Sequence, residues 1–545
     1  MKRTGFLEGA FIAYVAIIIS KVLGALYSIP FYKMVGDEGG VIYSCAYNIY
    51  ALFLDISTCG IPIAVSIAIS EYNAKGMYRS KERAYRIAFV AVAVVSLLSF
   101  VLLQIFAGQI GAYFMKGMTE GVTAEQVASG IRAVSTCLLI APFLSLKRGY
   151  LQGHKILAPT STSQMLEQIV RIAVVLGGAY LAIYKFDKSK TFAVCIALTG
   201  AAVGALAAYV YLEFKYRRNR FLFSETEEKG IALASRKEIA RKIGSYCLTI
   251  VIVSVANSVY GIVDMKMLLS GLHNLHYADQ QVQVIASISS TWIPKICMII
   301  TALSMGLTTS LAPHMAESRA KGEMEKANHT LNQAVSALLM IAVPIAGGMM
   351  LLAEPLFRLF YGYNDFGAGI LQVSTVVTVM ACVATTVGMS MQSMQRGKMV
   401  CVATICGIIA NAGLDLPLIY LFDAIGIPAY LGAPTASVVG QLVATTILMV
   451  SLHRSCQFSF MPIFRNVLRI ILPMAAMLFA VYGIRYVWPI VETRGVRLVL
   501  QLVVFAVVGA IVYFALCLLT GAVSGAVGDG FVQKLREKFL PRKKK

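Results

Sequence analysis

The stretch AYRIAFVAVAVVSLLSFVLLQIFAG, residues 84–108, decides the fold class of this chain. Arg86, near its start, is its single charged residue, and aliphatic side chains fill most of the other positions. A helix needs about 20 predominantly apolar residues to cross the hydrocarbon core of a membrane. The stretch is therefore predicted to be a membrane-spanning helix.

Comparable stretches fill much of the 545-residue chain, which is 58% hydrophobic and 14% charged and has a mean hydropathy of +0.74. A soluble domain carries about a quarter charged residues, and its core cannot hold this much apolar surface. We therefore expect an all-α, multi-pass membrane protein. Its fourteen predicted transmembrane helices cover residues 6–30, 41–69, 84–108, 128–149, 158–183, 191–214, 239–263, 282–312, 330–353, 366–392, 399–421, 430–453, 466–488 and 497–520.

The basic residues outside these spans gather on one side of the membrane. With the N-terminus inside, the inner loops and termini hold 34 of the 48 Lys and Arg residues, whereas the outer loops hold 9. This asymmetry follows the positive-inside rule and predicts that both termini are cytoplasmic. Because topology explains most of the net charge of +21, we expect no nucleic-acid partner.

The chain lacks the motifs of the common enzyme and cofactor classes. Its eleven cysteines form no CxxC pair, and neither a GxxxxGK[ST] phosphate loop nor an HExxH zinc motif occurs. We therefore expect no catalytic residue, metal or cofactor, and a transporter is favoured over an enzyme.

Two short segments recur at nearly the same offset in the two halves of the chain. Ile69–Gly76 resembles Met315–Gly322, and Gln152–Lys155 resembles Gln395–Lys398, all in predicted cytoplasmic loops. Matches in order indicate an internal repeat of six helices. Because six is even, the two lobes should be related by a pseudo-twofold axis along the membrane normal, around a cavity that opens to alternate sides. The predicted parts are a first lobe (1–214), a cytoplasmic linker (215–238), a second lobe (239–453), two extra C-terminal helices (454–520) and a basic cytoplasmic tail (521–545).

Ionisable side chains inside the predicted spans are the candidate functional residues, because burying a charge in a bilayer is costly. Lys21 and Lys295 lie near the middle of their spans, and neither has an acidic residue three or four positions away. Both are expected to face the cavity. The span 158–183 carries Gln164, Glu167, Gln168 and Arg171 on one helical stripe. An ion pair between Glu167 and Arg171, without a role in binding, is the equal alternative.

Other polar residues within the spans complete the candidate set. Arg132 is a substrate-binding candidate, although it lies near the interface and could snorkel to it instead. Asp55 could bind a coupling ion or brace a helix bend near Gly60 and Pro62. The remaining candidates for a coupling-ion site or a polar cavity wall are Asn48, Asn257, Asn411 and Asp415, together with Glu167. Cations exceed anions near mid-depth, which favours an anionic substrate such as a phosphate or pyrophosphate.

Several motifs in the first half resemble one known family. They are Ser20–Gly24, Gly36–Gly39, Ser57–Pro62, Arg148–Gly153, and Pro159–Thr160 with Ser163–Arg171. These segments resemble the polysaccharide-transport branch of the multidrug/oligosaccharidyl-lipid/polysaccharide exporter superfamily, in particular the group similar to stage V sporulation protein B and related to lipid II flippases.

The resemblance implies a flippase of the bacterial cytoplasmic membrane that moves an undecaprenyl-pyrophosphate-linked sugar, with lipid II or a polysaccharide precursor as the expected cargo. We expect the protein to act as a monomer. It also implies a cationic cavity in which Lys21 contacts the pyrophosphate, extra helices that contact the lipid tail, and a possible coupling cation. The sequence departs from the family at Ser28 and Ile67, where relatives often have basic residues. The alternatives are a cation-coupled multidrug exporter of the same superfamily and a membrane enzyme or scaffold that handles polyprenyl lipids.

Overall fold

The computed structural model describes residues 19–58, 60–74, 76–154, 156, 158–219 and 233–523. Three predicted segments lie partly outside these residues. The start of the first predicted span and nearly all of the basic tail lie outside the described residues, as does the middle of the predicted linker. Within the described part the chain is helical and contains no strand, which confirms the all-α fold class.

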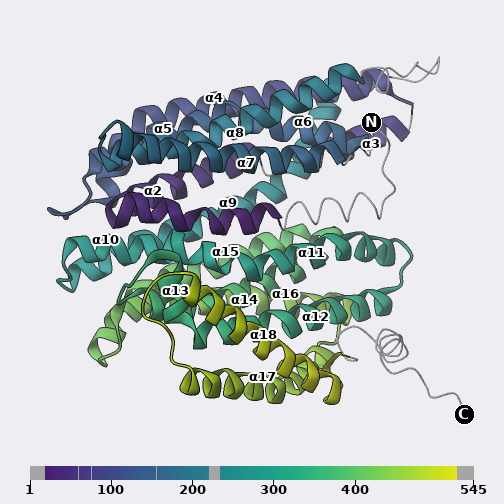
Figure 1. Ribbon diagram of the computed structural model, residues 1–545. Coiled ribbons are helices and arrows are strands. Elements are labelled where there is room, and N and C mark those ends of the chain that lie inside the picture. Colours follow the sequence, from purple (N-terminus) through teal and green to yellow (C-terminus); the bar gives the residue numbers. More distant parts are fainter. Residues whose placement is uncertain are drawn as a thin grey trace, which may run out of the picture. The chain divides into compact units, whose positions relative to one another are not determined.

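The chain divides into two compact units, Met1–Lys295 and Ile296–Lys545. The helices of the first unit run alongside one another in Figure 1, and α9 packs against α2, α3 and α4. This unit contains α2 (Ser28–Thr58), α3 (Ile61–Ala74), α4 (Tyr78–Phe114), α5 (Ala124–Ser135), α6 (Ala141–Gly153), α7 (Ala158–Tyr180), α8 (Lys190–Arg218), α9 (Arg236–Asn274), α10 (Asp279–Ser287) and the beginning of α11 (Ile293–Ala320).

Among the described residues, the second unit continues α11 and adds seven further α-helices. Its tightest pairs are α15 with α16, α14 with α16, and α17 with α18. The helices are α12 (Met324–Leu351), α13 (Ala353–Tyr361), α14 (Gly367–Ser393), α15 (Gly397–Ala424), α16 (Gly432–Cys456), α17 (Met461–Val487) and α18 (Val496–Leu519).

Thirteen helices among the described residues are long and apolar enough to cross a membrane, which confirms a multi-pass membrane protein. One of these candidates, Ile19–Thr58, is 40 residues long. A straight helix of that length would span about 60 Å, twice the hydrocarbon core. It is interrupted at Gly36, whose φ of 65° and ψ of −166° are not helical. The number of fourteen spans, the symmetry of the lobes and the lobe boundaries stay predictions.

Two backbone segments of the first unit depart from regular α-helix. The helical structure is interrupted between α2 and α3 at Gly60. A Cβ atom at this position would lie 2.8 Å from the carbonyl oxygen of Cys247 on α9. Between α10 and α11 the residues Ile288–Trp292 form a π-helical turn. Pro294, two residues after this turn, cannot donate a backbone hydrogen bond, which favours such a local rearrangement.

Candidate functional site

Lys295 lies in the first turn of α11, and its side chain is buried against aromatic rings. Its Nζ atom lies 4.3 Å from the ring centroid of Trp292, 4.5 Å from that of Tyr43 and 5.1 Å from that of Tyr27. The same atom lies 3.5 Å from the Tyr27 hydroxyl, and the residue is only 6% exposed. We call these four residues the aromatic lysine site.

The rings of the aromatic lysine site support one another. Tyr43 stacks on Trp292 at a centroid distance of 5.6 Å, and the hydroxyls of Tyr27 and Tyr43 lie 3.1 Å apart. The face of an aromatic ring carries partial negative charge and attracts a cation, by about 2 kcal/mol when the pair is desolvated. No carboxylate among the described residues forms an ion pair with Lys295. Ring faces therefore take the place of a counter-ion.

A row of polar contacts continues from this site along α2. The hydroxyl of Ser44 lies 2.7 Å from that of Thr291, and the Asn48 amide lies 3.5 Å from the same Thr291 oxygen. Further along, Ser258 on α9 donates a hydrogen bond of 2.5 Å to Asp55. The structure thus places Asn48 and Asp55 on one helix face, with polar partners on neighbouring elements. Asp55 thus interacts with α9, and its bracing and ion-binding roles both stay predictions.

A cluster with two buried arginine side chains lies between α6 and α7. Glu167 accepts a bond of 2.7 Å from Arg171 and another of 2.9 Å from Arg148, whose Nε also donates to Ser163 at 2.9 Å. All three charged side chains are largely buried, with exposed fractions between 14% and 25%. Two guanidinium groups share one carboxylate, so the cluster keeps one positive charge in excess. We call these four residues the arginine site.

Close helix packing holds the arginine site in place. Gly204 on α8 approaches α7 so closely that a Cβ atom there would lie 2.6 Å from the Glu167 carbonyl oxygen and 3.2 Å from the Arg171 Cβ. The glycine lets α8 cover one side of α7, and the charged ends turn toward α6. The predicted pair between Glu167 and Arg171 is therefore present, and it is shared with a second arginine.

The other candidates occupy more varied positions. Lys21, Gln164 and Gln168 are half-buried in the first unit, and Asn257 is exposed. Arg132 forms an exposed ion pair of 2.8 Å with Glu125. Its side chain is 41% exposed, as the snorkelling alternative would require. Asn411 and Asp415 are fully buried one helical turn apart on α15, in the second unit.

Sequence reasoning missed Arg148 and the three aromatic residues around Lys295 as site residues. Arg148 belongs to the RGYLQG segment that carries the family resemblance, and this was the available signal. Trp292, one of only two tryptophans in the chain, stands three residues before Lys295. Within the described residues, no group of three or more His, Cys, Asp or Glu side chains could hold a metal ion.

Comparison with known proteins adds independent information. The family model described as "Polysaccharide biosynthesis protein" matches residues 6–276, and the MatE model matches residues 249–416. The lipid II flippase MurJ of Bacillus subtilis is 28% identical over 98% of this chain and 97% of its own length. Stage V sporulation protein B of the same organism is 23% identical over 66% of this chain and 68% of its own length.

A solved structure extends the likeness to the fold. The lipid II flippase MurJ in an inward closed conformation superposes with a TM-score of 0.64 at 15% identity. The match covers 94% of this chain and 99% of that structure. At this identity the likeness concerns the fold alone. Two of these relatives, the MurJ proteins, are lipid II flippases.

Proposed function

We propose that the chain flips an undecaprenyl-pyrophosphate-linked sugar across the cytoplasmic membrane, because it is similar to the polysaccharide biosynthesis family over residues 6–276 and to the lipid II flippase MurJ over nearly its whole length. The relatives support a multi-pass membrane transporter that moves lipid-linked oligosaccharides. The finer identification, a sugar carried on a pyrophosphate, with lipid II foremost, is our proposal.

The observation that carries the proposal is the excess of positive charge in the arginine site. Glu167 neutralises only one of its two arginine partners, and all three side chains are largely buried. A guanidinium group binds phosphate oxygens through parallel N–H donors, so Arg148 and Arg171 suit a pyrophosphate. Such a ligand would supply the negative charge that the cluster lacks.

We assign Lys295 and Lys21 to the same anionic headgroup at a different stage of transport. The Lys295 ammonium group is held by ring faces and carries no carboxylate partner among the described residues, so an approaching phosphate has no ion pair to displace. The headgroup would enter from the cytoplasm, contact these cations, and leave when the predicted lobes change orientation. Gln164 and Gln168 on α7, and Arg132 near the end of α5, could add hydrogen bonds to it.

We further propose that a coupling cation binds at Asn411 and Asp415. Their oxygens are suitable ligands for a hard cation, and both side chains are fully buried. Glu167 is less suitable, because two guanidinium groups already occupy its carboxylate. Asn48, Asn257 and Asp55 would then serve as polar cavity residues. We expect the Asp415→Asn variant to lose any dependence of transport on Na⁺ or K⁺ gradients. An unchanged dependence would refute the assignment.

Transport of labelled lipid II in proteoliposomes tests the proposed function. Wild-type protein should move the lipid, while Lys21→Ala and Lys295→Ala should be defective. Lys326→Ala removes an exposed lysine on α12 and serves as a matched control. Normal transport by both variants would refute the site assignment, and absence of transport by the wild type would refute the cargo.

A cation-coupled drug exporter is the second candidate, because the MatE family model matches residues 249–416. Such a protein would need an acidic cavity for cationic amphiphiles. The positive excess of the arginine site opposes this alternative. Drug sensitivity of a deletion strain separates the two, since only loss of a drug exporter should sensitise cells to cationic amphiphiles.

A further inference from the structure

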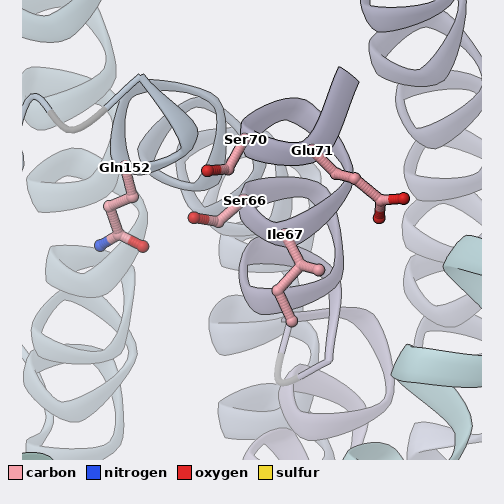
Figure 2. Close-up of a pocket in the computed structure, with 5 residues that line it drawn as sticks. All are labelled: Ser66, Ile67, Ser70, Glu71 and Gln152. Atoms are coloured by element: carbon pink, nitrogen blue, oxygen red, sulfur yellow. The ribbon is translucent and has the colours of Figure 1, made fainter. Parts of the chain in front are cut away.

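A polar pocket lies between α3 and α6, beside the arginine site. Its volume is about 450 Å³, and its lining residues are Ser66, Ile67, Ser70, Glu71 and Gln152. Pockets that bind small molecules typically measure about 300–1,000 Å³. Figure 2 shows the Ser66 and Ser70 hydroxyls turned toward the helix that carries Gln152, whereas Glu71 points away from this group.

Tight packing of α6 on α3 creates this arrangement. A Cβ atom at Gly153 would lie 2.8 Å from the Ile69 side chain and 2.9 Å from the Ser66 carbonyl oxygen. Only glycine lets the two helices approach this closely. Its neighbour Gln152 is consequently held opposite Ser66 and Ser70, which lie one turn apart on α3.

The three polar groups have hydrogen-bonding capacity to offer a ligand. In the part of the chain that the structure describes, no intramolecular hydrogen bond uses the Ser66 hydroxyl, the Ser70 hydroxyl or the Gln152 amide. Each hydroxyl can donate once and accept twice, and the amide can donate and accept. The lining contains a carboxylate and no cation, so it does not suit a phosphate. Neutral groups that both donate and accept suit the hydroxyl and amide groups of a sugar.

The position of the pocket relative to the arginine site adds a second argument. Gln152 follows Arg148 by four residues on α6, so both side chains leave the same helix face about one turn, or 5.4 Å, apart. In a lipid-linked sugar, the first sugar ring is bonded directly to the pyrophosphate. A headgroup whose phosphates contact Arg148 would therefore place its first sugar close to Gln152.

We infer that Ser66, Ser70 and Gln152 form a docking site for the sugar ring bonded to the pyrophosphate. This inference rests on the proposed function. The pyrophosphate would contact Arg148 and Arg171, the sugar hydroxyl and amide groups would bond to the three neutral side chains, and Ile67 would pack against the apolar face of the ring. The pocket thus distinguishes glycosylated lipid from the sugar-free carrier.

Transport of two lipids in proteoliposomes tests the inference. The lipids are undecaprenyl pyrophosphate and undecaprenyl pyrophosphate bearing one N-acetylated hexose. For Gln152→Ala and for Ser70→Ala, transport of the glycosylated lipid should fall about tenfold, as expected for a lost hydrogen bond. Transport of the sugar-free lipid should stay at the wild-type level, which also shows that the variants are folded. Gln109→Ala, at an exposed glutamine on α4, is the matched control and should change neither rate.

Each other outcome overturns the inference. Equal loss for both lipids would indicate a structural role for the pocket, and unchanged transport of the glycosylated lipid would show that the pocket does not contact the sugar. In both cases wild-type transport would leave the proposed function intact. Wild-type protein that moves neither lipid would refute the proposed function and the docking site together.

Discussion

The aromatic lysine site and the arginine site hold buried cations in different ways. Lys295 lies among three ring faces at 4.3 to 5.1 Å, without a carboxylate partner among the described residues. Arg148 and Arg171 instead share Glu167 through bonds of 2.9 and 2.7 Å. Ring faces attract a cation without forming a directed ion pair, whereas the carboxylate ties two helices together by specific bonds.

We expect this difference to give the two sites different contributions to stability and to transport. Breaking a buried ion pair leaves an uncompensated charge, so the arginine site should be sensitive to the loss of its carboxylate. Removing the Lys295 ammonium leaves three ring faces that a methionine side chain can contact, and the Tyr27 hydroxyl keeps its partner Tyr43. We therefore expect the arginine site to contribute to both folding and binding, and Lys295 to contribute to binding alone.

The largest effect on stability is expected for Glu167→Gln. The substitution leaves two guanidinium groups close together without an anion, which should lower the free energy of unfolding by about 3–5 kcal/mol. Thermal unfolding in detergent measures the loss. Glu125→Gln removes the exposed partner of Arg132 and should cost at most about 1 kcal/mol. Equal effects of the two substitutions would remove the distinction between the buried and the exposed pair.

The next effect is expected for Lys295→Met, the variant that best distinguishes a role in folding from a role in substrate binding. Transport should fall by about a hundredfold, because a buried cation that contacts the substrate is worth about 2–5 kcal/mol. The free energy of unfolding should stay the same or rise, since an apolar side chain of similar volume removes a desolvation penalty. A strongly destabilised variant would show that the rings require the cation for folding.

A smaller effect is expected for Trp292→Leu. The substitution removes one face of the aromatic lysine site and the stack with Tyr43, and it should lower the free energy of unfolding by about 2 kcal/mol. Trp488→Leu is the matched control, because Trp488 is 45% exposed and contacts Phe505 edge-on. The Trp488→Leu substitution should lower the free energy of unfolding clearly less than Trp292→Leu does. The reverse order would contradict the importance of the ring faces around Lys295.

The smallest effect is expected for Ser163→Ala in the arginine site. Ser163 is fully buried and accepts a hydrogen bond of 2.9 Å from Arg148 Nε. Loss of this hydrogen bond should lower the free energy of unfolding by about 1–2 kcal/mol and leave the bonds of Glu167 in place. A loss as large as that of Glu167→Gln would mean that the serine, and not the shared carboxylate, holds Arg148.

Much of the fold follows from the sequence, because membrane-spanning helices need long apolar stretches and leave few alternatives. The stretch 84–108 lies within α4, and the pair between Glu167 and Arg171 follows from the four-residue spacing on one helix. Contacts between residues on different helices cannot be predicted from such local spacing. Arg148 reaches Glu167 from α6, and Tyr27 and Tyr43 reach Lys295 from far along the chain, so neither contact has a local pattern.

The backbone irregularities were only partly foreseeable. Pro294 indicates a disturbed helix near Lys295, but it does not show that a π-helical turn presents Thr291 to Ser44. Pocket residues such as Ser66 and Ser70 look like ordinary helix residues in the sequence. Their importance depends on the close approach of α6 at Gly153, which sequence spacing alone does not reveal.

The central claim is that the chain transports an anionic, lipid-linked headgroup. The most direct measurement compares the transport, by the wild-type protein in proteoliposomes, of one sugar joined to the same polyprenyl chain by a pyrophosphate or by an uncharged linkage. We expect transport of the pyrophosphate-linked sugar and little or no transport of the uncharged analogue. Equal transport of the two lipids would contradict it.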